Sequence, residues 1–141
     1  MVWRKKANSI KSSEYEGKQD KIKQLNLKKY LERVRWVYEG QKEEVYLYSE
    51  EFNSICPKTG LPDFATISIK YYPGAYLVEE KSLKIYLTQY RNVGIFQENA
   101  CIKIQQDLQE LLEVNVLVVM EFKARGGISV EVKAGRLEDE V

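Results

Sequence analysis

The stretch EEVYLYSEEFNSICPKTGLPDFATISIKYY, residues 43–72, contains two runs in which apolar and polar side chains alternate, with a turn-rich loop between them. The alternation covers residues 43–52 and again residues 63–72, and it is typical of strands that bury one face. Two prolines and a glycine interrupt the loop, and these residues favour turns. The stretch therefore predicts two strands that pair as an antiparallel hairpin, joined by a loop that contains Cys56.

Two helices and two further strands are predicted after this hairpin. Residues 79–92, EEKSLKIYLTQYRN, and residues 97–113, QENACIKIQQDLQELLE, each place apolar side chains on one helical face. Residues 114–123, VNVLVVMEFK, are predicted to form a strongly apolar strand, and the turn ARGG leads to a last strand over residues 128–134. The order β-β-α-α-β-β, with strands joined as hairpins, predicts an α+β fold in which two helices pack on one face of an antiparallel sheet.

The length of the chain predicts a single domain, because 141 residues can bury a core without disulfide bonds. Residues 1–40 begin with a polar, lysine-rich segment, so we expect a partly ordered N-terminal arm there. Within this arm, residues 21–37 carry apolar positions that predict a short helical or irregular segment. The folded domain is expected to span residues 41–141.

The composition excludes several classes of protein. The chain has no histidine, which rules out histidine-ligated zinc sites and catalytic triads with an imidazole base. Its 2 cysteines are too few for an all-thiolate zinc site or for the disulfide framework of a secreted protein. The formal net charge of +1 gives no support for binding to nucleic acid or a membrane, and no apolar run reaches membrane-spanning length. We therefore expect a cytoplasmic protein without a metal.

Cys56 lies in a loop whose other residues are not typical of a buried segment. A thiolate is a strong nucleophile when its surroundings favour the ionised form, and Asp63 is the nearest candidate proton acceptor. The alternatives are that Cys56 is a small buried residue and that Asp63 caps a turn. The residues alone leave these alternatives open. Cys101, in contrast, falls on the apolar stripe of the second helix and is predicted to belong to the core.

Charged side chains near the helices and the last turn have both a structural and a functional interpretation. Glu98 is either a carboxylate stabilised by the helix dipole or an acceptor for the paired N–H groups of a guanine-like edge. Lys81 and Lys84 form either a solvated helix face or a clamp for a polyanion. Arg125 is either a surface charge on a hairpin or a phosphate ligand. The residue pattern alone favours the structural interpretation in each case.

Four segments, FNSICPKTGLPDFATI, VEEKSLKIYLTQYRN, GIFQEN and RGGISV, occur in this order within about residues 45–132. Together they resemble the NADPH-dependent 7-cyano-7-deazaguanine reductases (QueF), the nitrile reductases of queuosine biosynthesis, in their short single-domain form. The resemblance implies the tunnelling fold (T-fold), a β-β-α-α-β-β unit whose subunits close into an oligomeric barrel. It also implies that the sites lie between subunits and that the assembly is a homodecamer of two stacked pentamers.

The same resemblance implies roles for individual residues. Cys56 matches the nucleophile that adds to the nitrile carbon and forms a covalent thioimide, and Asp63 matches the acid/base that serves the thiol and the nitrile nitrogen. Glu98 matches the glutamate that holds the deazapurine edge. The other residues expected at the substrate are Glu79, at the start of the signature helix, Phe96 and Gln97.

The resemblance assigns the binding of the NADPH phosphates to Lys81, Lys84 and Arg125. The chain also departs from the family pattern at two positions. Gln97 stands where the family carries a histidine, and glutamine forms hydrogen bonds but cannot shuttle a proton. Glu80 stands where serine or leucine is usual, and its negative charge is expected to weaken phosphate binding.

The predicted function is the reduction of free 7-cyano-7-deazaguanine to 7-aminomethyl-7-deazaguanine with two NADPH, without direct contact with nucleic acid. Two other functions remain compatible with the sequence. One is the amidine-forming enzyme of archaeosine synthesis, which acts on the nitrile base in tRNA with the same cysteine and aspartate. That enzyme lacks the cofactor-lysine signature, so the intact string EEKSLKIY weighs against it. The other is a T-fold paralogue with impaired catalysis, which only Gln97 supports.

Overall fold

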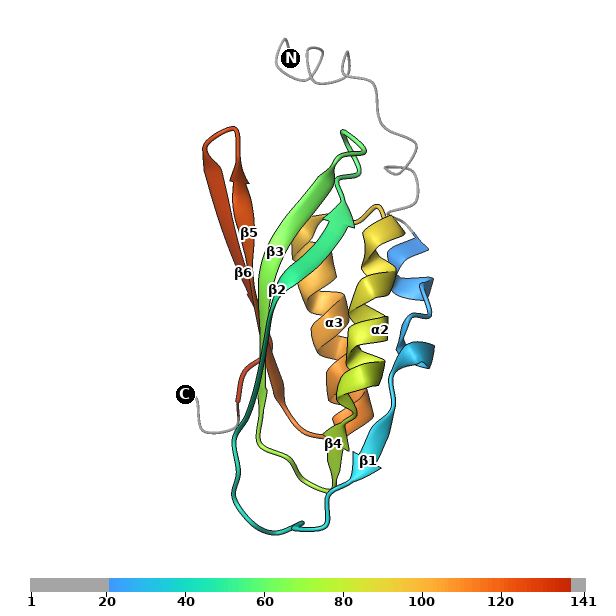
Figure 1. Cartoon of the computed structure of the whole chain (residues 1–141), viewed down its shortest axis with the longest axis vertical. Coiled ribbons are helices and arrows are strands. Elements are labelled where there is room, and N and C mark those ends of the chain that lie inside the picture. Colours follow the sequence, from blue (N-terminus) through green and yellow to red (C-terminus); the bar gives the residue numbers. More distant parts are fainter. Residues whose placement is uncertain (1–20, 138–141) are drawn as a thin grey trace.

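The computed structural model describes residues 21–137, and in it a four-stranded antiparallel sheet packs against two helices that cover one of its faces (Figure 1). In chain order the elements are η2 (Lys28–Tyr30), β1 (Arg33–Arg35), β2 (Val45–Ile55), β3 (Pro62–Tyr71), β4 (Tyr76–Val78), α2 (Glu80–Gln89), η3 (Tyr90–Asn92), α3 (Gln97–Leu112), β5 (Val116–Arg125) and β6 (Ile128–Ala134). The strand order in the sheet is β2-β3-β5-β6, which leaves β2 and β6 at the two edges. The predicted α+β order of hairpin, two helices and hairpin is confirmed.

The core lies between the helix-facing side of the sheet and the two helices. The alternation in β3 places Ala65, Ile67 and Ile69 on this side, and each is 1% exposed, as the sequence predicts. Tyr86 from α2 and Ile104 from α3 pack over the sheet and are fully buried. Each fully buried aliphatic side chain stabilises the fold by roughly 1.5–3 kcal/mol, so this layer supplies much of the driving force for folding.

Cys101 belongs to this core, as its place on the apolar stripe predicts. Its side chain is fully buried on α3, and its Sγ lies 3.6 Å from the carbonyl oxygen of Val118 and 3.5 Å from that of Val132. Burial raises the pKa of the Cys101 thiol to about 12. The thiol therefore stays protonated near neutral pH and is a poor nucleophile.

The segment before the sheet packs on the helices. Ile22, Leu27 and Leu31 join the hydrophobic core, and β1 pairs with β4 as a short antiparallel ribbon that the sequence did not predict. Residues 1–20 lie outside the described residues, so the arm over residues 1–40 and its boundary stay predictions. Within residues 21–137, no helix is long and apolar enough to cross a membrane.

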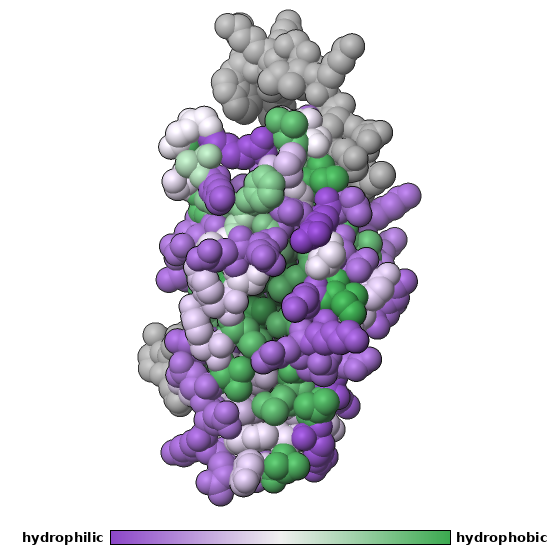
Figure 2. All heavy atoms as spheres, viewed as in Figure 1, coloured by the Kyte–Doolittle hydropathy of each residue, from purple (hydrophilic) through white to green (hydrophobic). Residues whose placement is uncertain are grey.

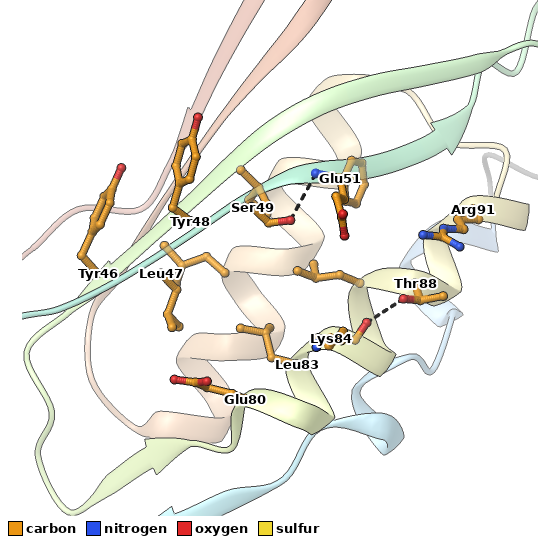
Figure 3. Close-up of a pocket in the computed structure, with 14 residues that line it drawn as sticks. Tyr46, Leu47, Tyr48, Ser49, Glu51, Glu80, Leu83, Lys84, Thr88 and Arg91 are labelled. Atoms are coloured by element: carbon orange, nitrogen blue, oxygen red, sulfur yellow. Dashed lines mark hydrogen bonds between the residues drawn. The ribbon is translucent and has the colours of Figure 1, made fainter.

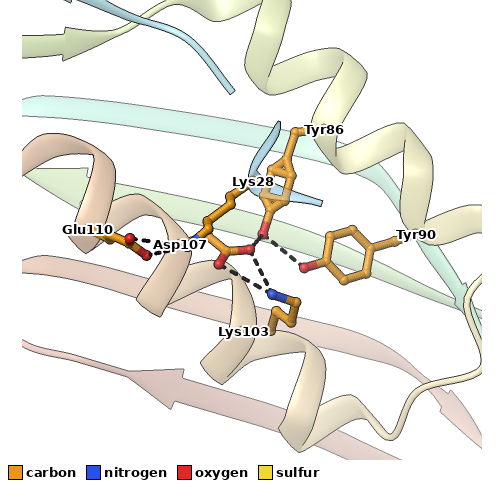
Figure 4. Close-up of polar contacts among 6 residues, drawn as sticks. All are labelled: Lys28, Tyr86, Tyr90, Lys103, Asp107 and Glu110. Carbon is orange, nitrogen blue, oxygen red and sulfur yellow. Dashed lines mark hydrogen bonds and ion pairs between the residues drawn. The ribbon is translucent and has the colours of Figure 1, made fainter. Parts of the chain in front are cut away.

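A buried polar cluster joins the two helices (Figure 4). The hydroxyl of Tyr86 donates to Oδ2 of Asp107 at 2.6 Å and lies 2.9 Å from the hydroxyl of Tyr90. Burial raises the pKa of both phenols, so both keep their protons; the Tyr86 proton goes to Asp107, and Tyr90 must donate to the Tyr86 oxygen. Lys103 completes the cluster with an ion pair to Asp107 at 3.1 Å.

Replacing Asp107 with alanine is expected to lower the free energy of unfolding by about 3–5 kcal/mol, because it leaves a buried ammonium group without its counter-ion. Lys103 is only 11% exposed and cannot regain full hydration without local rearrangement. Glu110→Ala, on the same helix, is the matched control, since it removes an exposed ion pair with Lys28 and should cost less than about 1 kcal/mol. Urea unfolding of the two variants measures the difference, and equal effects would contradict the role of the buried cluster.

Candidate active site

The loop after β2 holds Cys56 through its own backbone. The Cys56 amide donates to the carbonyl of Leu61 at 2.8 Å, and the Gly60 amide donates to the carbonyl of Cys56 at 2.8 Å. Gly60 has a φ of 73°, a left-handed conformation that glycine adopts without steric cost. The CPKTG sequence thus forms a closed loop that fixes the backbone of Cys56 at the mouth of the β2–β3 hairpin.

The connection between the two helices runs beside the end of β2. The Ile55 amide donates to the carbonyl of Val93, and the Ile95 amide donates to the carbonyl of Ile55, both at 3.0 Å. These two bonds form a short parallel bridge around Gly94. Because α3 starts two residues later at Gln97, the bridge brings the first turn of α3 next to the Cys56 loop.

A cavity of about 320 Å³ lies where these pieces meet. Its walls come from the Cys56 loop, the start of β3, the first turn of α3 and the end of β5. The lining residues are Cys56, Pro57, Thr59, Asp63, Phe96, Gln97, Glu98 and Arg125. Six of the residues that the sequence singles out, distributed over some seventy positions, therefore share one cavity. Cys56 is partly exposed there, unlike the buried Cys101.

Asp63 is nearly buried in this cavity and is held by Arg125. Nη1 of Arg125 donates to Oδ1 of Asp63 at 2.7 Å and to the carbonyl oxygen of Pro62 at 2.9 Å. The Asp63 side chain is 7% exposed, whereas that of Arg125 is 40% exposed. The guanidinium group thus compensates the charge of a carboxylate that has little water around it. The sequence did not predict this pairing.

Glu79 does not line this cavity in the described chain. Its carboxylate caps the N-terminus of α2, accepting from the backbone amides of Ser82 at 2.7 Å and Lys81 at 2.9 Å. These two hydrogen bonds lower the pKa of the Glu79 carboxyl, so it stays ionised. The capping role is one that sequence reasoning missed, although an acceptor three residues before Ser82 at the start of a helix is its usual signal.

Lys84 lies in a second cavity, of about 340 Å³, between β2 and α2 (Figure 3). Leu47 and Leu83 contribute to its apolar floor, and Lys84 and Arg91 add positive charge along α2 and η3. Figure 2 shows apolar side chains exposed in the middle of this face, framed by hydrophilic ones. Sequence reasoning missed Arg91, which stands seven residues after Lys84 and hence about two helical turns along the same face.

The basic residues are therefore divided between two places within one chain. Arg125 lines the Cys56 cavity, Lys84 lines the second cavity, and Lys81 is exposed and lines neither. Glu80 also lines the second cavity, at the first turn of α2, where its negative charge faces the same space as Lys84. The assignment of the three basic residues to NADPH phosphates stays a prediction.

Comparison with known proteins gives one consistent family. The family model described as "QueF-like protein" matches residues 62–140. The chain is 51% identical over 105 residues to the NADPH-dependent 7-cyano-7-deazaguanine reductase of Caldicellulosiruptor bescii, covering 74% of this chain and 80% of that protein. It is 47% identical over 108 residues to the protein of the same name from Thermoanaerobacter pseudethanolicus, covering 76% and 81%.

A solved structure supports the fold. The crystal structure of the archaeosine synthase QueF-Like in the apo form superposes with a TM-score of 0.61, covering 65% of this chain and 91% of that one. The sequence identity is 22%, so this likeness supports the shared T-fold and carries no argument about the reaction.

Proposed function

This chain belongs to the QueF-like family, and we propose that it reduces the nitrile of 7-cyano-7-deazaguanine to an aminomethyl group with two NADPH. It is identical at about half of the aligned positions to NADPH-dependent 7-cyano-7-deazaguanine reductases. The observation that carries this proposal is the cavity that joins a partly exposed cysteine, a nearly buried aspartate and a glutamate at a helix start. The archaeosine synthase reaction is not favoured, because its support is a structural likeness at 22% identity.

The proposed chemistry begins at Cys56. Its sulfur adds to the nitrile carbon, a C–S bond forms, and the C≡N triple bond becomes the C=N bond of a thioimide. Asp63 accepts the thiol proton and returns it to the nitrogen. One hydride and one proton then give a hemithioaminal, which releases the Cys56 thiol and leaves an imine. A second hydride and proton give the amine, so the two reductions consume two hydrides and two protons.

The other residues of the cavity are proposed to orient the base. The Glu98 carboxylate can accept the paired N–H groups of the deazaguanine edge. Phe96 offers an aromatic surface beside it, and Gln97 can hold a polar group of the substrate without carrying a proton. Since glutamine does not titrate, proton transfer in this proposal rests on Asp63 alone.

The residues of the second cavity fit a nicotinamide dinucleotide. Lys84 and Arg91 place two cations along one side of an apolar-lined space, a donor set that suits phosphate groups beside flat rings. When bound, NADPH supplies the hydride. Lys84 and Arg91 are proposed to hold its phosphates, and the apolar floor to exclude water from the reacting atoms.

The assembly is proposed to be a closed homo-oligomer, with the decamer as the expected size. Lys84 and Cys56 line different cavities of one chain, so a site that joins them is most simply completed by a second copy. The edge strands β2 and β6 support this, because water-exposed edges of a sheet are normally paired or covered. Light scattering should give a mass well above the 16.5 kDa of one chain, and a monomer would contradict the proposal.

The decisive experiment is NADPH oxidation by the purified chain with 7-cyano-7-deazaguanine. We expect about two NADPH consumed for each nitrile reduced, with the aminomethyl product detected by mass spectrometry. Oxidation of NADPH without this product would contradict the proposed function. An amidine formed on tRNA without NADPH would indicate the archaeosine reaction instead. Binding of the nitrile with neither reaction would identify the impaired paralogue.

Lys84→Ala is expected to raise the KM for NADPH about tenfold, the loss of one charge-assisted hydrogen bond to a phosphate. Glu80→Ala, in the same cavity, should act in the opposite direction and lower this KM about two- to fivefold, because it removes a repelling charge. Both effects should shrink at high salt. Steady-state kinetics at two ionic strengths tests this pair, and changes of the same sign would exclude a phosphate site there.

A further inference from the structure

A buried serine stands beside the proposed acid/base without a hydrogen-bond partner. Ser54 is 0% exposed, and its Oγ has no hydrogen bond among the residues that the structure describes. Asp63 is its direct partner across the β2–β3 hairpin. Both side chains are buried on the helix-facing side of the sheet. Directly opposed side chains in an antiparallel pair are in contact range, and the register sets the Ser54 side chain opposite that of Asp63.

The same hairpin relates Ser54 to Cys56. β2 ends at Ile55, and the Cys56 amide continues the hairpin by donating to the carbonyl of Leu61, so Ser54 stands two residues before Cys56 at the end of the same arm. Ser54 is therefore opposite Asp63 and close to Cys56 along the chain. A buried hydroxyl without a partner destabilises a fold relative to an apolar group, and native structures rarely keep one. The unpaired hydroxyl of Ser54 is therefore a candidate for a role in the reaction.

The protonated form of Asp63 needs a hydrogen-bond acceptor, which Arg125 does not provide. Arg125 bonds Oδ1 and offers only donors, so it serves the ionised carboxylate but not the protonated carboxyl. The other charged or titratable groups that line this cavity are Cys56 from the loop and Glu98 from α3. When Asp63 carries the proton of Cys56, its O–H needs an acceptor. A hydroxyl both donates and accepts, and can serve the two states by rotation alone.

We propose that Ser54 is the positioning residue of Asp63: its hydroxyl donates to the ionised carboxylate and accepts from the protonated carboxyl, holding the group between Cys56 and the substrate nitrogen. The proton moves from the Cys56 thiol to Asp63 and then to the nitrogen, and Ser54 neither gains nor loses one. This inference rests on the proposed function, since it names a further residue of the same site.

Ser54→Ala is expected to lower activity with little change in stability. The melting temperature should change little, because the hydroxyl has no hydrogen bond in the described structure and its removal leaves almost no space. The rate of adduct formation at Cys56 and kcat should fall about tenfold, the loss of one hydrogen bond to a charged group, with the KM for the nitrile within about twofold.

Matched variants separate this role from a packing role. Ser68→Ala, on the opposite face of β3, should leave all of these rates unchanged. Ser54→Thr keeps the hydroxyl and should recover adduct formation while lowering the melting temperature, because its methyl group enters a filled site. Full activity of Ser54→Ala, or a loss of activity in step with a loss of stability, would overturn the proposal.

A readout without substrate keeps this inference separate from the proposed function. Alkylation of Cys56 by iodoacetamide near neutral pH needs only the thiol and its proton acceptor. It should be about tenfold slower in Ser54→Ala than in the wild-type chain if Ser54 supports Asp63. An inactive wild-type chain whose alkylation still depends on Ser54 would contradict the reductase function but not the role of Ser54. If the wild-type chain is active and Ser54→Ala leaves both alkylation and turnover unchanged, the role of Ser54 would be contradicted but the reductase function would not.

Discussion

Cys56→Ala is expected to abolish the covalent adduct with the nitrile substrate and to lower turnover by roughly 10⁴-fold or more, the scale found when a catalytic nucleophile is removed. A nitrile is a poor hydride acceptor, and only the thioimide offers a C=N bond that can be protonated and reduced. Incubation without NADPH should stop the wild-type reaction at this stage. Intact-mass measurement should then find one substrate mass added to the wild-type chain and none added to the variant.

Cys101→Ala is the matched control for this prediction. The Cys101 thiol is fully buried and its pKa is raised to about 12, so it is neither accessible nor ionised near neutral pH. The variant should form the same adduct at the wild-type rate, with a modest loss of stability from the small cavity that it leaves. An adduct that survives in Cys56→Ala, or one that disappears in Cys101→Ala, would remove Cys56 from the role of nucleophile.

The main elements of the fold were predictable because long periodic segments determine them. The two-residue period of residues 63–72 corresponds to β3, and Ala65 and Ile67 are buried as expected. The ribbon of β1 and β4 was not predictable, since each strand has three residues and no period can be read from so few. Its pairing, with Arg33 opposite Val78, joins parts of the chain that lie far apart in sequence.

The identity of the site residues was more predictable than their contacts. The string around Cys56 and Asp63 is distinctive enough to single them out, and one cavity holds both. The ion pair between Arg125 and Asp63 was not predictable, because it depends on how β3 and β5 are aligned across a separation of 62 residues. Ser54 was missed for a similar reason, since only the register of the hairpin places it opposite Asp63.

Asp63→Asn is expected to lower both the rate of adduct formation and kcat by about 10²–10⁴-fold, the usual contribution of general acid–base catalysis. Asparagine has the same size and keeps an oxygen that can accept from Arg125, so the fold and the cavity should persist. What it loses is the ability to take the Cys56 proton. Gln97 cannot compensate, because its amide does not titrate.

The rate of adduct formation without NADPH measures this prediction apart from the hydride steps. Stopped-flow or rapid-quench measurement gives this rate for the wild-type chain and for Asp63→Asn. A variant with the wild-type rate would assign the proton transfer to another group.

An Arg125→Gln variant tests whether the guanidinium group of Arg125 acts in adduct formation or in NADPH binding. Adduct formation needs no NADPH, so an Arg125→Gln variant that slows it must act through Asp63, whose Oδ1 it contacts at 2.7 Å. Loss of a hydrogen bond to a charged group predicts a decrease of about tenfold to 100-fold. If Arg125 instead serves only the phosphates of NADPH, the variant should form the adduct at the wild-type rate and show a raised KM for NADPH. The ion pair observed in the cavity favours the first outcome, because Nη1 of Arg125 is already bound to a nearly buried carboxylate that would lose its counter-ion in the variant.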